Sequence, residues 1–108
     1  MVTPQRRERI AQIHRDLEQY SYYELLNIDA NAAADDVRQA FHRMALGLHP
    51  DRYQAAADPA LQQQVYAIYK RITEGYRVLM EPQLRREYDD ALQLGQRRLV
   101  KTCLLYTS

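Results

Sequence analysis

One tripeptide in this 108-residue chain, His49-Pro50-Asp51, brings together side chains that could act on another molecule. Proline fixes its own φ, has no N–H and pushes the preceding residue out of the helical region. A helix that reaches Leu48 must therefore end there, and the ionisable pair lies on a turn that faces solvent. Ionisable groups held rigidly outward on a turn indicate contact with a partner more than internal packing.

Amphipathic helical patterns lie on both sides of the tripeptide. The first helix is predicted over residues 34–48, with aspartates in its first turn and an apolar stripe along one face. Its expected cap residue, Ala33, has no side-chain oxygen, so we expect this helix to lack a cap worth about 1 kcal/mol. The second helix opens at Asp58 and Pro59, after an alanine-rich loop over 54–58. Together they predict an antiparallel hairpin with the tripeptide at its tip.

A helical lead-in is predicted at the N-terminus. Thr3 and Pro4 are typical cap and first-turn residues, and apolar side chains then recur three and four apart along residues 4–19. The lead-in could be a linker, a packing extension or an oligomer contact, and its apolar face favours the last two. A short apolar cluster follows at 22–26, either as the second half of one bent helix or as a separate helix.

A final helix is predicted over residues 83–94, with Arg85 and Arg86 turned outward in ordinary surface pairs. Gly75, inside the preceding helix, costs about 1 kcal/mol relative to alanine and indicates close approach of another helix. We assign no function to the tail over 95–108, whose residues 99–108 could be a truncation point, a non-native remnant or the beginning of a further domain.

Composition restricts the possible functions. At 12.8 kDa the chain is one domain with little room for a catalytic cleft, so we expect neither an enzyme nor a cofactor. Few glycines and prolines favour an all-α fold. A net charge of +1 is too even to imply nucleic acid. With a single cysteine and no segment of membrane-spanning length, we expect a cytoplasmic protein without a membrane partner.

Several segments, in order, resemble the J-domain, the module of DnaJ-type cochaperones, from about Tyr20 to Asp90. The similar segments are 22–26 to D-Y-Y-x-x-L, 37–45 to I-K-K-A-Y-R-K-L-A, 49–52 to H-P-D-K/R, 72–79 to I-N-E-A-Y-E-V-L and 82–89 to P-x-x-R-x-x-Y-D. The resemblance implies a J-domain-like antiparallel helical hairpin with short flanking helices over 20–94, preceded by an N-terminal helical extension over 1–19.

The resemblance also implies a function. Such domains engage the ATP-bound form of a heat shock protein 70 chaperone and stimulate its ATP hydrolysis, while cleaving nothing themselves. Asp51 would contact an arginine of the chaperone, with His49 and Pro50 holding the loop. Steering by the basic face of the preceding helix would fall to these residues: Arg38, His42, Arg43 and Arg52. Phe41 beside them would add an apolar contact.

The chain departs from the family pattern at this helix. Gly47 stands where the family usually has lysine or arginine, Leu48 stands where it often has tyrosine, and Asp35 adds an anion at the helix start. Without protonation of His42, the helix is close to neutral. We therefore expect either that attraction to the partner is weaker and less salt-sensitive than in a strongly basic member, or that the cognate chaperone is less acidic.

Other interpretations of the same residues stay open. His49 could be an ordinary helix-terminal histidine near backbone carbonyls, and Asp51 an ordinary turn or capping residue. His42 and His49 have no third histidine or cysteine nearby, so we expect no metal site. Two other functions remain: a J-like interaction or scaffold module that does not stimulate a chaperone, and a small helical nucleic-acid-binding domain. The oligomeric state is not predicted.

Overall fold

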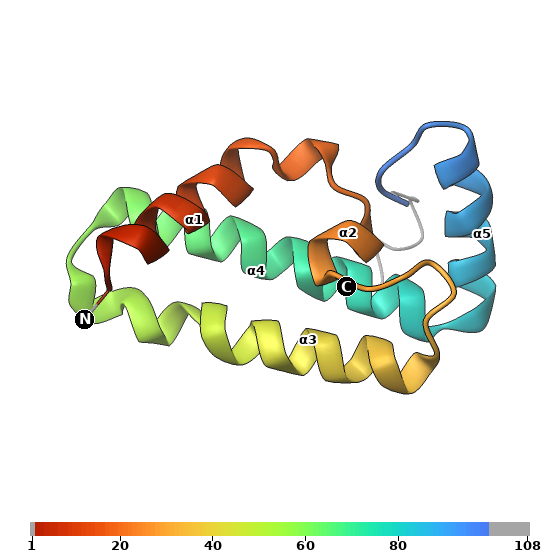
Figure 1. The fold of residues 1–108 in the computed structure, drawn as a ribbon, viewed down its shortest axis with the longest axis horizontal. Coiled ribbons are helices and arrows are strands. Elements are labelled where there is room, and N and C mark those ends of the chain that lie inside the picture. The colour runs from red at the N-terminus through yellow and green to blue at the C-terminus, as the bar shows by residue number, and fades with distance from the viewer. Residues whose placement is uncertain (1, 100–108) are drawn as a thin grey trace, which may run out of the picture.

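The computed structural model describes residues 2–99, which form an all-α fold without strands (Figure 1). The helices are α1 (Pro4–Arg15), the 3₁₀ helix η1 (Leu17–Gln19), α2 (Tyr22–Leu26), α3 (Ala34–Leu48), the 3₁₀ helix η2 (Pro50–Ala56), α4 (Pro59–Met80) and α5 (Pro82–Gln93). Within this range, no helix has the length and apolar character needed to cross a bilayer.

Helices α3 and α4 form the predicted antiparallel hairpin, and α4 is the central element of the fold (Figure 1). The apolar stripes of the two helices face each other, because their innermost side chains are completely buried. Those side chains include Val37 from α3 and Val65, Ile68 and Ile72 from α4. The helical periodicity of the sequence therefore identified the hairpin and its core face correctly.

Side chains close in sequence set the helix starts. Thr3, Asp58 and Glu81 each accept a backbone N–H from the first turn of the helix that follows, as their positions before a proline predict. Ala33 makes no such bond, as expected. The carboxylate of Asp36 instead accepts the N–H of Ala33, at 3.3 Å, which is half of a capping box.

The hairpin connection differs from the prediction in one respect. Helix α3 ends at Leu48 as expected, and His49 is extended, with φ −62° and ψ 130°. The alanine-rich loop predicted over 54–58 was wrong for residues 54–56, because Pro50–Ala56 forms the 3₁₀ helix η2 and only residues 57 and 58 are non-helical. Tyr53 explains the difference: its side chain is only 2% exposed, so the segment is anchored to the core instead of lying free in solvent.

The N-terminal lead-in packs on the hairpin as separate helices. Helix α1 runs beside α4 from the hairpin tip towards α2 (Figure 1). Ile10 and Leu17 are buried in the core, and so are Tyr22 and its neighbours on α2. Of the roles left open for the lead-in, the structure supports a packing extension.

Helix α5 packs at the far end of α4, and the chain then folds back. Gly95 has a φ of 91°, a left-handed conformation that glycine adopts readily just after the end of a helix. The hydroxyl of Tyr88 accepts the N–H of Tyr22 and donates to the carbonyl of Arg97, both at 2.9 Å. Leu99 is buried. The first residues of the predicted tail therefore belong to the folded core, while 100–108 lie outside the described residues.

The prediction that Arg85 makes an ordinary surface pair was wrong. Instead of a surface pair, its guanidinium donates to the carbonyls of Ala30 at 3.0 Å and Ala32 at 2.6 Å, and to the hydroxyl of Tyr23 at 3.1 Å. Arg85 thus holds the loop between α2 and α3 against α5. Arg86 is exposed and bonds to a neighbouring glutamine on the same helix, as a surface residue should.

Candidate functional site

The ring of His49 holds the conformation of the tripeptide. Its Nδ1 accepts the N–H of Asp51 at 3.2 Å, so the imidazole caps η2, whose first residue is Pro50. The ring also makes a T-shaped contact with Tyr69, with ring centroids 5.4 Å apart and planes at 67°. The backbone around Asp51 is therefore held by one histidine that is itself supported by α4.

The carboxylate of Asp51 points into solvent. Its side chain is 76% exposed, and its Oδ2 lies 3.7 Å from Nδ1 of His49. Of the simpler interpretations, the one for His49 needs revision, because the ring accepts a backbone N–H rather than approaching carbonyls. The geometry places an exposed negative charge on a backbone with little freedom, which suits recognition of a cationic group.

The carbonyls at the end of α3 find partners outside that helix. Arg52 donates to the carbonyl of Leu46 at 3.1 Å. The carbonyl of Gly47 accepts from the hydroxyl of Tyr53 and from the guanidinium of Arg6, both at 2.8 Å. The sequence predicted a role only for Arg52. Tyr53 could have been noticed from the sequence, because it is an aromatic residue in a segment of small and polar residues. No nearby residue in the sequence indicated a role for Arg6.

The four basic residues assigned to the site do not form one patch. Arg38 makes an ion pair with Asp35 one turn earlier, and His42 follows Arg38 by one turn on the same face. Arg43, the residue after His42, is rotated from it by about 100° around the helix axis. It faces a groove beside α2, whereas Arg52 lies next to Asp51 in η2. Only Arg52 is therefore next to the tripeptide.

Phe41 is half-buried in the hairpin. Its ring stacks on Tyr76 of α4, with centroids 4.3 Å apart and planes at 13°. His42 is exposed beside this pair, with its ring centroid 5.6 Å from that of Phe41. Phe41 thus has a packing role, and only part of the ring is available to another molecule.

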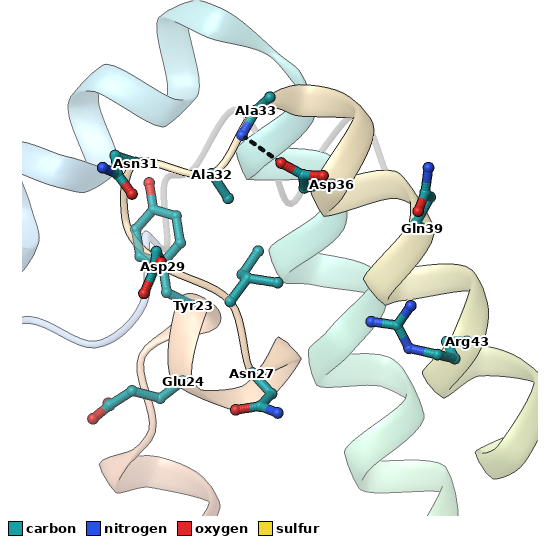
Figure 2. A pocket seen from close by; sticks show the side chains of 11 residues that line it. Tyr23, Glu24, Asn27, Asp29, Asn31, Ala32, Ala33, Asp36, Gln39 and Arg43 are labelled. Atoms are coloured by element: carbon teal, nitrogen blue, oxygen red, sulfur yellow. Dashed lines mark hydrogen bonds between the residues drawn. The ribbon is translucent and has the colours of Figure 1, made fainter.

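Figure 2 shows a groove between α2, α3 and their connecting loop, and no residue of the tripeptide lines it. The charged residues that line it are Glu24 on α2, Asp29 in the connecting loop, and Asp36 and Arg43, which both lie on α3. Two of these carboxylates already serve the backbone, because Glu24 accepts the N–H of Ser21 and Asp36 that of Ala33. We therefore treat the groove as a consequence of helix capping and not as part of the candidate site.

Comparisons with known proteins agree with the motifs. The family model of the DnaJ domain matches residues 21–89. Chaperone protein DnaJ of Mycoplasma genitalium is 38% identical over 68 residues, which cover 63% of this chain and 17% of that protein. DnaJ homolog subfamily C member 4 of Homo sapiens is 39% identical over 75 residues, which cover 69% and 29% of the two chains.

Subfamily C member 11 of Mus musculus is 32% identical over 74 residues, which cover 68% of this chain and 13% of that protein. The chain thus spans less than a third of the length of these curated relatives. No solved structure matches it.

Proposed function

Because this chain belongs to the DnaJ domain family, we propose that it binds the ATP-bound form of a heat shock protein 70 chaperone and stimulates ATP hydrolysis there. The partner carries out the chemistry, and no residue of this chain is assigned a catalytic role. The chain acts by contact: it would bind the chaperone in the conformation that hydrolyses ATP and so raise the population of that conformation.

The exposure of Asp51 is the observation that carries this proposal. The carboxylate of Asp51 is 76% exposed, so a partner can reach it without a rearrangement of this chain. The backbone of Asp51 is already ordered by its hydrogen bond to His49. A guanidinium on the chaperone would form a charge-assisted hydrogen bond with it. Since such bonds contribute about 1.5–3 kcal/mol, removing the charge should weaken the complex about 10- to 100-fold.

The cationic residues support a secondary role in the same contact. Arg52, adjacent to Asp51, would meet acidic groups of the chaperone directly. Arg38, His42 and Arg43 would act through the longer-range field, which falls off with ionic strength. Arg38 would contribute least to that attraction, because its charge is partly neutralised by the ion pair with Asp35.

Steady-state ATPase measurements on a cognate heat shock protein 70 test the proposal. The wild-type chain should raise the rate, and Asp51→Asn should remove most of the increase at the concentration that gives half-maximal stimulation by the wild type. Asp90→Asn is the matched control, because Asp90 is an exposed aspartate on α5, at the far end of α4 from the tripeptide. Both variants should keep the wild-type helical circular dichroism.

The outcomes separate two kinds of failure. A mutant that stimulates like the wild type would show that the site is elsewhere. A wild-type chain that binds the chaperone without raising ATP turnover would support the scaffold alternative, which the near-neutral α3 and its Arg38–Asp35 pair favour. The nucleic-acid alternative is less well supported, because Arg38 and Arg43 lie on different faces of α3.

A further inference from the structure

The carboxyl end of α3 depends on side chains from elsewhere in the chain. The last carbonyls of any α-helix have no partner within the helix, and the helix dipole makes this end attractive to cations. The last turn of α3 contains no basic residue of its own. This end of the helix leads directly into the tripeptide, so whatever holds it also holds the start of the loop.

Arg6 supplies a large part of that support from α1. Its Nη2 donates to the carbonyl of Gly47 at 2.8 Å, and its Nε donates to the hydroxyl of Tyr53 at 2.9 Å. The same hydroxyl donates to the same carbonyl at 2.8 Å, which closes a cluster of three groups. Gly47 precedes His49 by two residues and Tyr53 follows Asp51 by two. The guanidinium of Arg6 therefore links the residue two positions before the tripeptide to the residue two positions after it.

The residue at position 47 leaves room for this contact. A Cβ atom on Gly47 would lie 3.1 Å from Nη2 of Arg6, which is tighter than ordinary van der Waals contact. The guanidinium thus lies directly against the backbone of the last turn, where a larger side chain would compete for the same space.

The neighbouring arginine holds the other end of the loop. Arg7 forms an ion pair with Asp58, and Asp58 caps α4 by accepting the N–H of Leu61 at 3.2 Å. This N–H and the Arg7 guanidinium hold the pKa of Asp58 below its ordinary value. Since the side chain of Ile10 on α1 is only 2% exposed, packing fixes the position of both arginines.

We propose that α1 positions the His-Pro-Asp loop, with Arg6 as the positioning residue that keeps Asp51 in the conformation presented to its partner. This inference rests on the proposed function. It adds a part of the chain that precedes the DnaJ match, which begins at residue 21. Without Arg6, a smaller fraction of the molecules would have the loop in the conformation that binds the partner. The apparent affinity would fall in proportion to that fraction.

Arg6→Gln tests the inference, with Arg9→Gln as the matched control. Arg9 is also exposed on α1, so its removal changes the net charge by the same amount. Two measurements are needed: hydrogen–deuterium exchange of the free protein, and ATPase stimulation as a function of its concentration. Arg6→Lys, which keeps the cation without the forked guanidinium, should give intermediate values in both.

Exchange should change locally in Arg6→Gln. The amides of Asp51 and Arg52, which bond to His49, should exchange about 3- to 10-fold faster, while the amides of Ile68 and Ile72 in the core should not change. The concentration for half-maximal stimulation should rise by a similar factor with the maximal rate preserved. A purely structural role would speed exchange throughout the core.

Two results would overturn the inference: unchanged exchange at Asp51 and Arg52 in Arg6→Gln, or equal effects of Arg6→Gln and Arg9→Gln. The second result would mean that net charge matters and position does not. If the wild-type chain stimulated no chaperone, the proposed function would fail. The exchange measurement, which needs no chaperone, would still decide whether Arg6 holds the loop.

Discussion

The ring of Tyr22 lies on the backbone of Gly75, so close that a Cβ atom there would come within 3.0 Å of two ring carbons. The same ring stacks on Tyr88 of α5, with centroids 4.3 Å apart. Its hydroxyl donates to Glu74 and accepts the N–H of Leu99. One tyrosine of the short α2 therefore contacts α4, α5 and the segment after α5.

Gly75→Ala should lower the free energy of unfolding. Alanine favours a helix over glycine by about 1 kcal/mol, but overpacking against a buried ring costs about 1–3 kcal/mol. We expect a net loss of up to about 2 kcal/mol, measured as a shift of the urea midpoint. Gly47→Ala is a useful comparison, because there the added methyl meets no buried ring and displaces only the guanidinium of Arg6. A more stable Gly75→Ala protein would contradict the close packing of α2 on α4.

Arg85→Ala should be much more damaging than Arg86→Ala, although the two residues are adjacent on α5. Arg85 bonds to two carbonyls of the α2–α3 loop and to the hydroxyl of Tyr23, whereas Arg86 bonds to a side chain on its own helix. We expect losses of about 1–3 kcal/mol and less than about 0.5 kcal/mol, respectively. Thermal unfolding of both variants tests this, and equal melting temperatures would rule out the role assigned to Arg85.

Glu74 should make stability depend on pH in the acid range. Burial opposes its ionisation, but hydrogen bonds from Arg98 and Tyr22 outweigh that and hold its pKa below the ordinary 4.5. The unfolded chain then binds the proton more readily than the folded one. The contribution of Glu74 is therefore complete above pH 4.5 and is lost as the pH falls towards the folded pKa.

Urea unfolding at a series of pH values from about 7 to about 3 measures this contribution. Glu74→Gln should be less stable than the wild type at neutral pH and should lose less stability on acidification. Glu8→Gln, at an exposed position on α1, should follow the wild-type curve. Parallel curves for the wild type and Glu74→Gln would show that the bonds to Glu74 do not favour its charged form.

Most of the secondary structure could be predicted from the sequence because its signals are local. Thr3, Asp58 and Glu81 each bond to an N–H two or three residues away, so the cap and its helix are read in one short window. Pro50 ends α3 through its own ring. The packing of α3 against α4 follows from their apolar periodicity, and the exposure of the tripeptide follows from its place between them.

The contacts that hold the site were decided by the tertiary structure. Arg6 reaches Gly47 and Tyr53 across 41 and 47 residues, and Arg85 reaches Ala32 across 53. An arginine on an amphipathic helix has the same sequence signature whether it remains in water or finds a backbone carbonyl. Which of the two occurs depends on where packing places its helix, and buried residues such as Ile10 determine that placement. The sequence alone therefore determined the main α-helices and the exposed aspartate, and the assembled core determined which side chains hold that aspartate in place.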